Sequence, residues 1–131
     1  MNMKKEKYTW EEFEKDCKKI AAWAKSRHVK NIYGIPRGGL VAGVKLSHLL
    51  DIPLVLNRDD ITRDTLILDD IIDEGNTIER LLASIGEHHH VASIFYNKAA
   101  KHAPHFFVRE KKCWVIFPWE TEKTSTYDGT V

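Results

Sequence analysis

Two adjacent carboxylates, Asp69 and Asp70, stand at the end of the short apolar run Thr65-Leu66-Ile67-Leu68. An apolar run without alternation is typical of a strand that is buried on both faces of a parallel sheet. Carboxylates at the end of such a strand can accept hydrogen bonds from a sugar diol. Two neighbouring acids alone are more typical of a solvated turn, so the sugar-binding interpretation depends on the residues after them in the chain.

A polar turn is expected over residues 69–76, and it begins with the acidic pair and leads into an expected helix. Free N–H groups at a helix start, with the helix dipole behind them, favour a phosphate group. Gly75 allows the backbone to approach a ligand closely, and the Thr77 hydroxyl can add a donor. These residues predict a phosphate-binding loop: Asp73, Glu74, Gly75, Asn76 and Thr77.

A second turn rich in glycine lies earlier in the chain, in the sequence Tyr33-Gly34-Ile35-Pro36-Arg37-Gly38-Gly39-Leu40. Arg37 supplies a forked cation that suits phosphate oxygens. Pro-Arg-Gly-Gly by itself is a weak signal and more often a plain turn. Its position, one strand–helix–strand unit upstream of the acidic pair, strengthens the functional interpretation.

The elements that must position these turns alternate between strands and helices. Thr9 and Glu12 have the spacing of a capping box, and apolar residues from Trp10 to Ala24 fall on one helical face. Further helices are expected from residue 40 to about 50 and over 77–87, and strands over 31–35, 54–56, 65–68, 91–96 and 113–117. This order predicts one α/β domain over residues 1–131, with a mainly parallel twisted sheet flanked by helices. Ligands then bind at the carboxyl ends of the strands, near a switch in strand order.

These segments together resemble the 5-phosphoribosyl-1-pyrophosphate (PRPP) site of the type I phosphoribosyltransferases. The resemblance implies that Asp69 and Asp70 hold the ribose hydroxyls and bind Mg²⁺, directly or through water, while residues 73–77 hold the 5-phosphate. It also implies that Pro36, Arg37, Gly38 and Gly39 form the pyrophosphate loop, where a strained, often cis, peptide turns backbone N–H groups toward the leaving group.

A third segment, Cys113-Trp114-Val115-Ile116-Phe117-Pro118-Trp119-Glu120, resembles the base-binding hood of bacterial and archaeal 6-oxopurine phosphoribosyltransferases. The resemblance implies that Trp114 stacks on the purine and that the Val115 backbone reads the ring edge. Trp119 is expected to serve packing instead. An Asp at the place of Asp73 is typical of the 6-oxopurine members, in which it faces N7 as general base or charge stabiliser.

Two departures from the family pattern matter. Relatives carry a lysine shortly after the strand that matches residues 91–96, where it donates to the exocyclic oxygen at position 6. Here Asn97 takes that place, so Lys98 becomes the candidate and Lys101 the alternative. Relatives also carry a long mobile loop where this chain has only residues 57–64. In that short connection Arg58 or Arg63 could reach the pyrophosphate, but a solvated charged hairpin is the simpler expectation.

Composition fits a globular protein with small-molecule ligands. Of the 131 residues 43% are hydrophobic and 30% charged, and the net charge of +1 gives no reason to expect nucleic acid or a membrane surface as a partner. The charged start is not a secretory signal, and no apolar run reaches transmembrane length.

Cys17 and Cys113 are expected to be buried small residues, which fits a reduced cytoplasmic setting. A homodimer or higher homo-oligomer is expected.

Two hypotheses about function arise from the resemblance. The first is an enzyme that transfers the phosphoribosyl group from PRPP to a 6-oxopurine, releases pyrophosphate and forms a nucleoside monophosphate. The second is a non-catalytic or weakly catalytic regulator of the same fold that binds PRPP or a nucleotide. Asp73 and the Trp114 segment favour the enzyme, whereas the short 57–64 connection favours the regulator.

Overall fold

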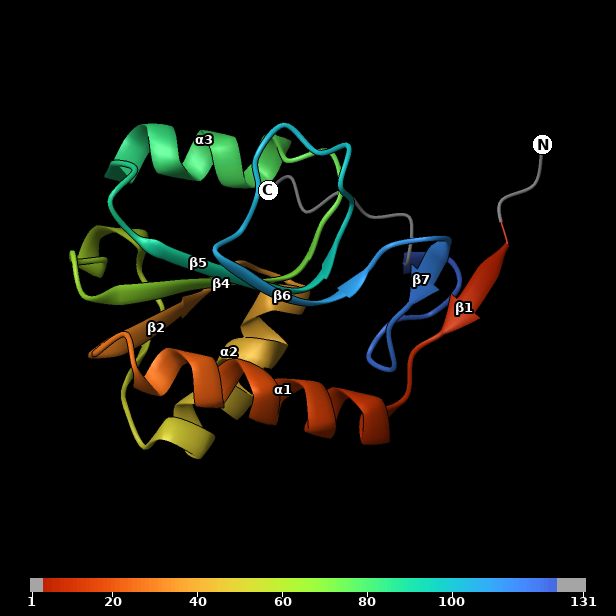
Figure 1. The fold of residues 1–131 in the computed structure, drawn as a ribbon, viewed down its shortest axis with the longest axis horizontal. Coiled ribbons are helices and arrows are strands. Elements are labelled where there is room, and N and C mark those ends of the chain that lie inside the picture. Colours follow the sequence, from red (N-terminus) through yellow and green to blue (C-terminus); the bar gives the residue numbers. More distant parts are fainter. Residues whose placement is uncertain (1–3, 125–131) are drawn as a thin grey trace.

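A sheet of five parallel strands forms the centre of the protein, seen in a computed structural model that describes residues 4–124. The strand order is β3-β2-β4-β5-β6. The strands are β2 (Asn31–Gly34), β3 (Leu54–Val55), β4 (Thr65–Ile72), β5 (His90–Tyr96) and β6 (Phe106–Glu110). Helices α1 (Trp10–Lys25) and α2 (Gly38–Leu50) lie below the sheet in Figure 1, and α3 (Asn76–Ile85) lies above it.

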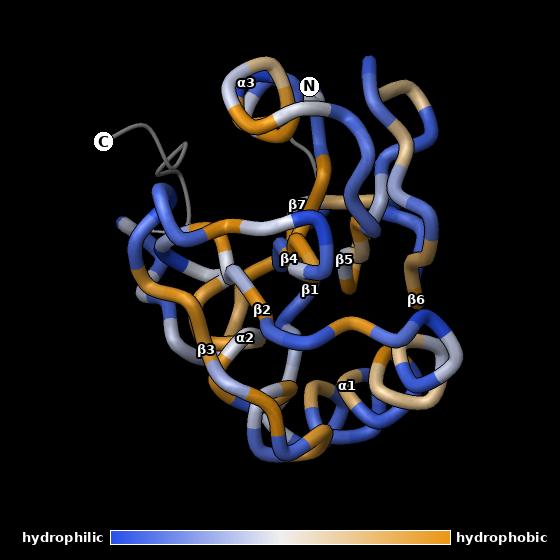
Figure 2. Tube along the Cα trace, turned by 90° about the vertical axis from the view of Figure 1, so that its left-hand side faces the viewer, coloured by the Kyte–Doolittle hydropathy of each residue, from blue (hydrophilic) through white to orange (hydrophobic). Residues whose placement is uncertain are grey.

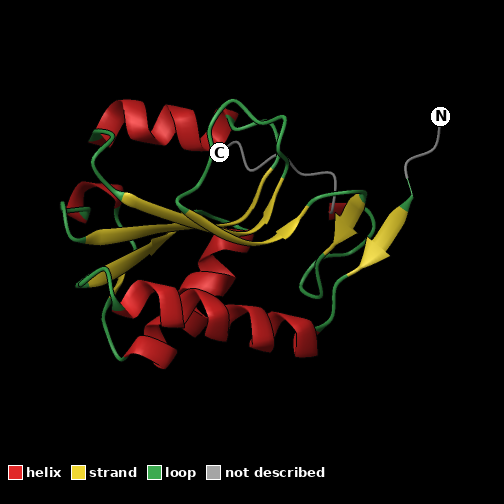
Figure 3. Cartoon of the chain, viewed as in Figure 1, coloured by secondary structure: helices red, strands yellow, loops and turns green. Residues whose placement is uncertain are grey.

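A second, smaller sheet joins the two ends of the chain. Strand β1 (Lys5–Lys7) pairs in parallel with β7 (Trp114–Ile116), and Figure 3 shows this pair beside the carboxyl end of the main sheet. The second sheet is the expected C-terminal hood, completed by an N-terminal strand. The part of the chain from residue 4 to 124 has no helix that is long and apolar enough to cross a membrane.

Strand β4 is central because both of its faces are apolar. Leu66 and Leu68 pack in the apolar cluster on the side of α1 and α2. Ile67 packs in the cluster on the side of α3, and all three side chains are fully buried. Successive side chains of a strand point to opposite faces, so one unbroken apolar run supplies both clusters. Figure 2 shows the complementary pattern in α1 and α3, where hydrophobic and hydrophilic residues alternate around the turns.

The expected helices are confirmed, and the capping box at the start of α1 forms as predicted. The Thr9 hydroxyl accepts from the Glu12 backbone N–H at 3.1 Å, and the Glu12 carboxylate accepts from the Thr9 backbone N–H at 3.1 Å. Cys17 lies in the core, where burial raises the pKa of its thiol to about 12. Trp10 departs from the expectation, because 54% of its surface stays exposed.

The boundaries around the acidic pair differ from the prediction. The sequence predicts a turn over residues 69–76, but β4 continues through Ile72, so Asp69 and Asp70 belong to the strand itself. Pairing with β5 extends this far because Ile71 and Ile72 continue the ladder opposite Phe95 and Tyr96. The sequence pattern predicts neither β1 nor β6. The tail beyond position 124 lies outside the described residues.

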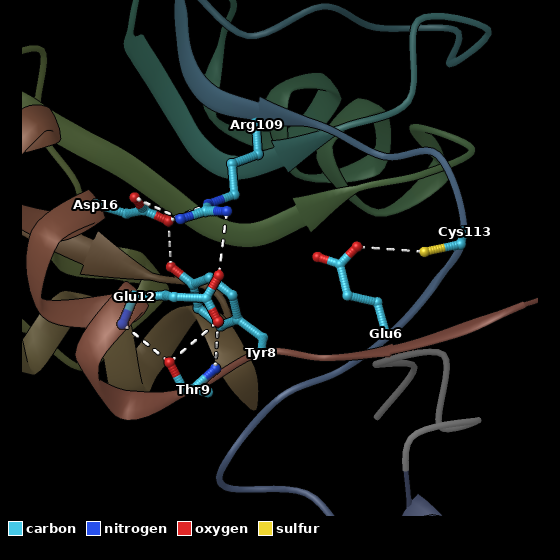
Figure 4. A network of polar contacts seen from close by, with 7 residues as sticks. All are labelled: Glu6, Tyr8, Thr9, Glu12, Asp16, Arg109 and Cys113. Carbon is cyan, nitrogen blue, oxygen red and sulfur yellow. Dashed lines mark hydrogen bonds and ion pairs between the residues drawn. The ribbon is translucent and has the colours of Figure 1, made fainter.

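A buried carboxylate ties the first helix to the far edge of the sheet. The side chain of Asp16 on α1 is 1% exposed, and its Oδ2 accepts from the Tyr8 hydroxyl at 2.5 Å and from Arg109 Nε at 2.6 Å (Figure 4). Arg109 on β6 also pairs with Glu12 at 3.2 Å. Tyr8 comes directly after β1, so this network fixes the N-terminal strand, α1 and β6 relative to one another.

Removal of the shared acceptor should therefore destabilise the fold. Asp16→Ala leaves the Tyr8 hydroxyl and the Arg109 Nε without it, and we expect the free energy of unfolding in urea to fall by about 2–4 kcal/mol. The control is Glu14→Ala on the exposed side of the same helix, where pairs with Lys18 and Lys45 should be worth less than about 1 kcal/mol. Equal losses in both variants would contradict a special role for the buried network.

Candidate active site

A cavity of about 770 Å³ opens at the carboxyl ends of β2 and β4. The chain runs from β2 outward to β3, then crosses back to β4 and continues in the opposite direction to β5 and β6. The direction of strand order therefore reverses between β2 and β4, which is where α/β sheets bind ligands. The cavity is lined by three groups of residues that include 35–38, 69–78 and, from the C-terminal segment, Lys111, Trp114, Val115, Phe117, Trp119, Glu120, Thr121 and Thr124.

The acidic pair forms one wall of this cavity. Asp69 and Asp70 are each 9% exposed. The backbone N–H of Asp70 donates to Asp69 Oδ1 at 2.9 Å, and that of Ile71 donates to Asp70 Oδ1 at 2.8 Å, so both carboxyls are held in place. Burial raises the pKa of both, and the Asp70 charge raises that of Asp69 further. A bound cation or hydroxyl donors would relieve this unfavourable charge.

The turn after β2 touches the acidic pair. The peptide bond between Pro36 and Arg37 is cis, as is often found in the family's pyrophosphate loop. A Cβ at Gly38 would overlap the Asp70 carboxylate, and one at Gly39 would lie 2.7 Å from the Leu68 carbonyl oxygen. Only glycine therefore allows this close approach of the two loops. Pro36, Arg37 and Gly38 line the cavity, whereas Gly39 serves the packing beneath it.

The expected phosphate loop lies beside the acidic pair, and all of residues 73–77 line the cavity. Gly75 has φ of +88°, and a Cβ there would lie 2.9 Å from the His102 nitrogen. Helix α3 begins at the next residue, Asn76, and no side chain of the described residues caps its N-terminus. The segment after β5 supports the loop, since the Lys101 N–H donates to the Glu74 carbonyl at 2.9 Å. This arrangement suits an anionic phosphate.

Asp73 is held between two donors. Asn97 Nδ2 donates to its Oδ1 at 2.9 Å, and Lys111 Nζ lies 2.7 Å from its Oδ2. Partial burial by itself would raise the pKa of the Asp73 carboxyl, but the hydrogen bonds from Lys111 and Asn97 and the Lys111 charge outweigh it and lower the pKa. Asp73 is therefore ionised at neutral pH.

The lysine that lines the cavity is neither of the two that the sequence analysis named. The Lys98 side chain is 65% exposed, its Nζ lies 3.6 Å from Glu110, and neither it nor Lys101 lines the cavity. Lys111 does line it, with a side chain that is only 9% exposed. The sequence analysis missed Lys111 because Lys112 stands next to it, and the sequence does not show which of two adjacent lysines faces a cavity. The only available signal was that Lys111 lies three residues before Trp114.

The hood brings an indole to the cavity. Trp114 and Val115 both line it, and the backbone N–H of Trp114 donates to the Lys4 carbonyl at 2.9 Å. Trp119 stacks on Phe117 with ring centroids 4.8 Å apart and packs edge-on against Phe13, as expected for a packing role, although it also reaches the cavity wall.

The short connection over residues 57–64 does not reach the cavity. Residues Arg58–Asp60 form a single 3₁₀ turn, and neither Arg58 nor Arg63 lines the cavity. The C-terminal segment does reach the cavity, where Glu120, Thr121 and Thr124 line the wall. Burial raises the pKa of Glu120, and the Asp70 charge adds to this effect.

The donor set at the cavity suits a magnesium ion shared with a ligand. No cluster of three or more His, Cys, Asp or Glu side chains that could hold a metal occurs within residues 4–124. Two neighbouring buried carboxylates, by contrast, match the way Mg²⁺ is usually bound, through one or two carboxylates plus substrate phosphates. Asp69 and Asp70 therefore fit a metal that arrives with a phosphorylated ligand.

Comparison with known proteins identifies the architecture. No family model and no curated protein sequence matches the chain. The structure of a purine phosphoribosyltransferase from Pyrococcus horikoshii Ot3 matches with a TM-score of 0.77 and 26% identity, over 89% of this chain and 95% of that chain. The chain has the fold of the type I phosphoribosyltransferases.

Two further structures share this phosphoribosyltransferase fold. The xanthine-guanine-hypoxanthine phosphoribosyltransferase of Helicobacter pylori matches with a TM-score of 0.80 and 22% identity, over 92% of this chain and 97% of that chain. A hypothetical protein from Neisseria gonorrhoeae with bound ppGpp matches with a TM-score of 0.74 and 19% identity, over 93% of this chain and 92% of that chain. The expected fold class is confirmed.

The two buried carboxylates should lower the free energy of unfolding at neutral pH, although we expect them to bind the ligand. A carboxyl whose pKa is raised in the folded protein holds its proton more tightly there than in the unfolded chain, so stability falls as the pH rises above the ordinary aspartate range. We expect Asp69→Asn or Asp70→Asn to remove part of this loss of stability, because an amide does not ionise. The amide oxygen can still accept from the same backbone N–H. Urea unfolding at pH 5 and pH 7 should show the largest gain at pH 7.

The same variants should weaken PRPP binding, measured by calorimetry with Mg²⁺, by about tenfold or more, since loss of a charged acceptor typically costs about 1.5–3 kcal/mol. Asp64→Asn, at an exposed position, is the control for both measurements. An Asn variant that loses stability at pH 7 while it binds PRPP normally would contradict this assignment.

Proposed function

We propose that this protein transfers the 5-phosphoribosyl group of PRPP to a 6-oxopurine, releasing pyrophosphate and forming a purine nucleoside monophosphate. The observation that carries the proposal is the cavity that joins a buried acidic pair, the start of α3 without a side-chain cap, the Pro36–Arg37 turn and the Trp114 indole. Two structural neighbours, a purine and a xanthine-guanine-hypoxanthine phosphoribosyltransferase, support it.

PRPP would lie across the loops at the carboxyl edge of the sheet. The N–H groups of residues 73–77 would hold the 5-phosphate, and the carboxylates of Asp69 and Asp70 would accept from the ribose hydroxyls. The turn at 36–38 would face the pyrophosphate. A bound Mg²⁺ would neutralise charge on the ribose and pyrophosphate oxygens and make the leaving group better.

The reaction would join a purine nitrogen to C1 of the ribose as the C1–oxygen bond to pyrophosphate breaks. The electron pair of that bond leaves with the pyrophosphate, and positive charge develops on the ribose and on the purine. Asp73 would accept the N–H of the purine ring. Its lowered pKa makes it a weak general base, so it would stabilise the developing charge with a carboxylate that is already ionised, and the proton of the purine N–H would then be released to solvent. A homo-oligomeric state and a cytoplasmic location remain part of this proposal.

A second candidate is a regulator that binds PRPP or a nucleotide without efficient transfer. The ppGpp bound to the Neisseria gonorrhoeae neighbour favours it, as does the single 3₁₀ turn where relatives are expected to carry a long mobile loop. A site without that loop would admit water, which can hydrolyse a reactive intermediate. The two candidates therefore differ in what happens to bound PRPP.

One assay separates them. Purified protein with Mg²⁺ and labelled PRPP is given hypoxanthine, guanine, xanthine or adenine in turn, and the nucleotide, ribose 5-phosphate and pyrophosphate are quantified. The enzyme hypothesis expects nucleotide formation with at least one 6-oxopurine. Tight PRPP or nucleotide binding with neither transfer nor hydrolysis would favour the regulator.

Asp73 should act on turnover rather than on PRPP binding. Asp73→Asn keeps the size and removes the charge, so kcat for the preferred purine should fall by roughly 10²–10⁴. PRPP affinity should stay within about threefold, because the N–H groups of the loop are unchanged. Wild-type turnover in the variant would show that the carboxylate is not needed in the transition state.

Trp114 and Trp119 should separate base binding from packing. Stacking of a base on an aromatic ring is worth about 1–3 kcal/mol, so Trp114→Ala should raise the purine KM about tenfold or more. Trp119→Ala should mainly lower the unfolding midpoint, because it removes the ring contacts with Phe13 and Phe117. Steady-state kinetics and thermal unfolding of both variants test this, and the reverse result would place the base elsewhere.

A further inference from the structure

The connection between β5 and β6 packs against the expected phosphate loop. It covers residues 97–105 and none of these residues is helical, although a crossover between parallel strands commonly needs a dozen or more residues. Figure 1 shows it on the α3 side of the sheet, beside the start of that helix. The Lys101 N–H donates to the Glu74 carbonyl at 2.9 Å, and a Cβ at Gly75 would lie 2.9 Å from the His102 nitrogen. The connection therefore supports the phosphate loop from the side opposite the cavity.

Two hydrogen bonds fasten the far end of this connection to β5. The backbone N–H of His105 donates to the Val91 carbonyl at 2.8 Å, and the Val91 N–H donates to His105 Nδ1 at 3.0 Å. We call these two bonds the His105 clasp. Only Ala103 and Pro104 separate His102 from the clasp, and the proline ring fixes one of the backbone angles between them. A change at the clasp is thus transmitted to the phosphate loop through few rotatable bonds.

The clasp is complete in only one protonation state of the ring. An imidazole nitrogen accepts a hydrogen bond only while it carries no proton, so the Val91 N–H requires a neutral His105 with its proton on Nε2. In the imidazolium both ring nitrogens are donors, and Nδ1 would then face the Val91 N–H as donor against donor. The Val91 carbonyl already accepts from the His105 backbone. Protonation therefore removes one of the two bonds of the clasp.

The groups around His105 disfavour its protonation. Partial burial and the neighbouring basic groups lower the pKa of His105, and a contribution of the Val91 backbone in the other direction is too small to offset them. These basic groups are His90 on β5, with ring centroids 5.9 Å apart, His102 in the connection, and Arg27 after α1. His105 is therefore neutral at neutral pH and takes up its proton below the ordinary histidine pKa of about 6.5.

We propose that His105 is a positioning residue for the phosphate loop, which holds a phosphorylated ligand tightly only while the His105 clasp is complete. The inference rests on the proposed function of residues 73–77 as the phosphate-binding loop. His105 does not line the cavity, so it acts on the ligand only through the connection. Acidification breaks the clasp, loosens the support of Glu74 and Gly75, and lowers the affinity for PRPP.

PRPP affinity measured against pH tests the proposal, with His105→Asn as the decisive variant. The Asn Oδ1 takes the place of the imidazole Nδ1 and can accept from the Val91 N–H, but an amide cannot be protonated in this range. Calorimetry with Mg²⁺ at pH 7.5 should give the same affinity for the variant and the wild type. At pH 5 the variant should bind PRPP about two- to tenfold more tightly, which corresponds to one hydrogen bond.

Two further variants serve as controls. His105→Ala removes the acceptor at every pH, so at pH 7.5 it should already bind PRPP about two- to tenfold more weakly than the wild type. His88→Asn changes an exposed member of the neighbouring histidine run and should keep the pH dependence of the wild type. Titration of PRPP and of the acidic pair is common to all four proteins, so the ratio of affinities at each pH isolates His105.

Amide hydrogen exchange follows the clasp without a ligand. At pH 5, residues 73–77 and 97–105 should exchange faster in the wild type than in His105→Asn, whereas α1 should exchange alike in both proteins. If the variants are unstable, an NMR titration of the wild type replaces them. Protonation of His105 and loss of protection of the Lys101 N–H must then share one midpoint.

Three results would overturn the proposal. They are an equal pH dependence of PRPP affinity in the wild type and His105→Asn, normal PRPP binding by His105→Ala at pH 7.5, or separate midpoints in the NMR titration. Failure of the wild type to bind PRPP, with the difference in exchange intact, would instead overturn the proposed function of the loop.

Discussion

Burial of β4 on both faces is the constraint on which the rest of the structure depends. Leu66, Ile67 and Leu68 fill the two apolar clusters, so this strand must lie inside the sheet, with β2 and β5 on either side. The same strand continues into Asp69 and Asp70 without a break. The two carboxylates therefore come from the strand at the centre of the sheet, and backbone N–H groups hold them without a ligand.

The position of β4 also determines what surrounds the acids. Strand order reverses between β2 and β4, so the loops after these strands separate and leave a cavity. Gly38 and Gly39 let the first of these loops come into contact with the end of β4, and Gly75 lets the second turn into α3. Two glycine-containing turns and one strand are thus enough to build the PRPP half of the proposed site.

Much of this could be predicted from the sequence, because the signals are local. The capping box at Thr9, the unbroken apolar run at 65–68 and the Gly-containing turns each describe their own backbone. The parts that were missed depend on distant partners. Strand β1 is three charged residues whose only recognisable feature is its pairing with β7, and β6 completes the edge of a sheet that β5 begins.

The choice of lysine shows the same limit in the site itself. Alignment with relatives led to Lys98, which comes after β5 in the sequence but turns toward Glu110. Lys111 comes from the segment after β6 and reaches Asp73 because the chain folds back toward the hood there. A charge at a given point of a cavity can be supplied from any segment that passes it, and linear spacing does not record which segment does so.

The pairing of β1 with β7 closes nearly the whole described chain into one loop. Closing so long a loop is costly in chain entropy, and contacts between such distant segments form late in folding. The hood contacts the rest of the protein through this short ladder, through the Tyr8 ring contacts, and through Val115 and Phe117, which are buried in the same apolar cluster as Leu66 and Leu68. Opening of the hood would therefore expose part of that cluster to water, at a cost in free energy. The Trp114 side of the cavity is thus anchored in the same core as the strand that carries the acidic pair.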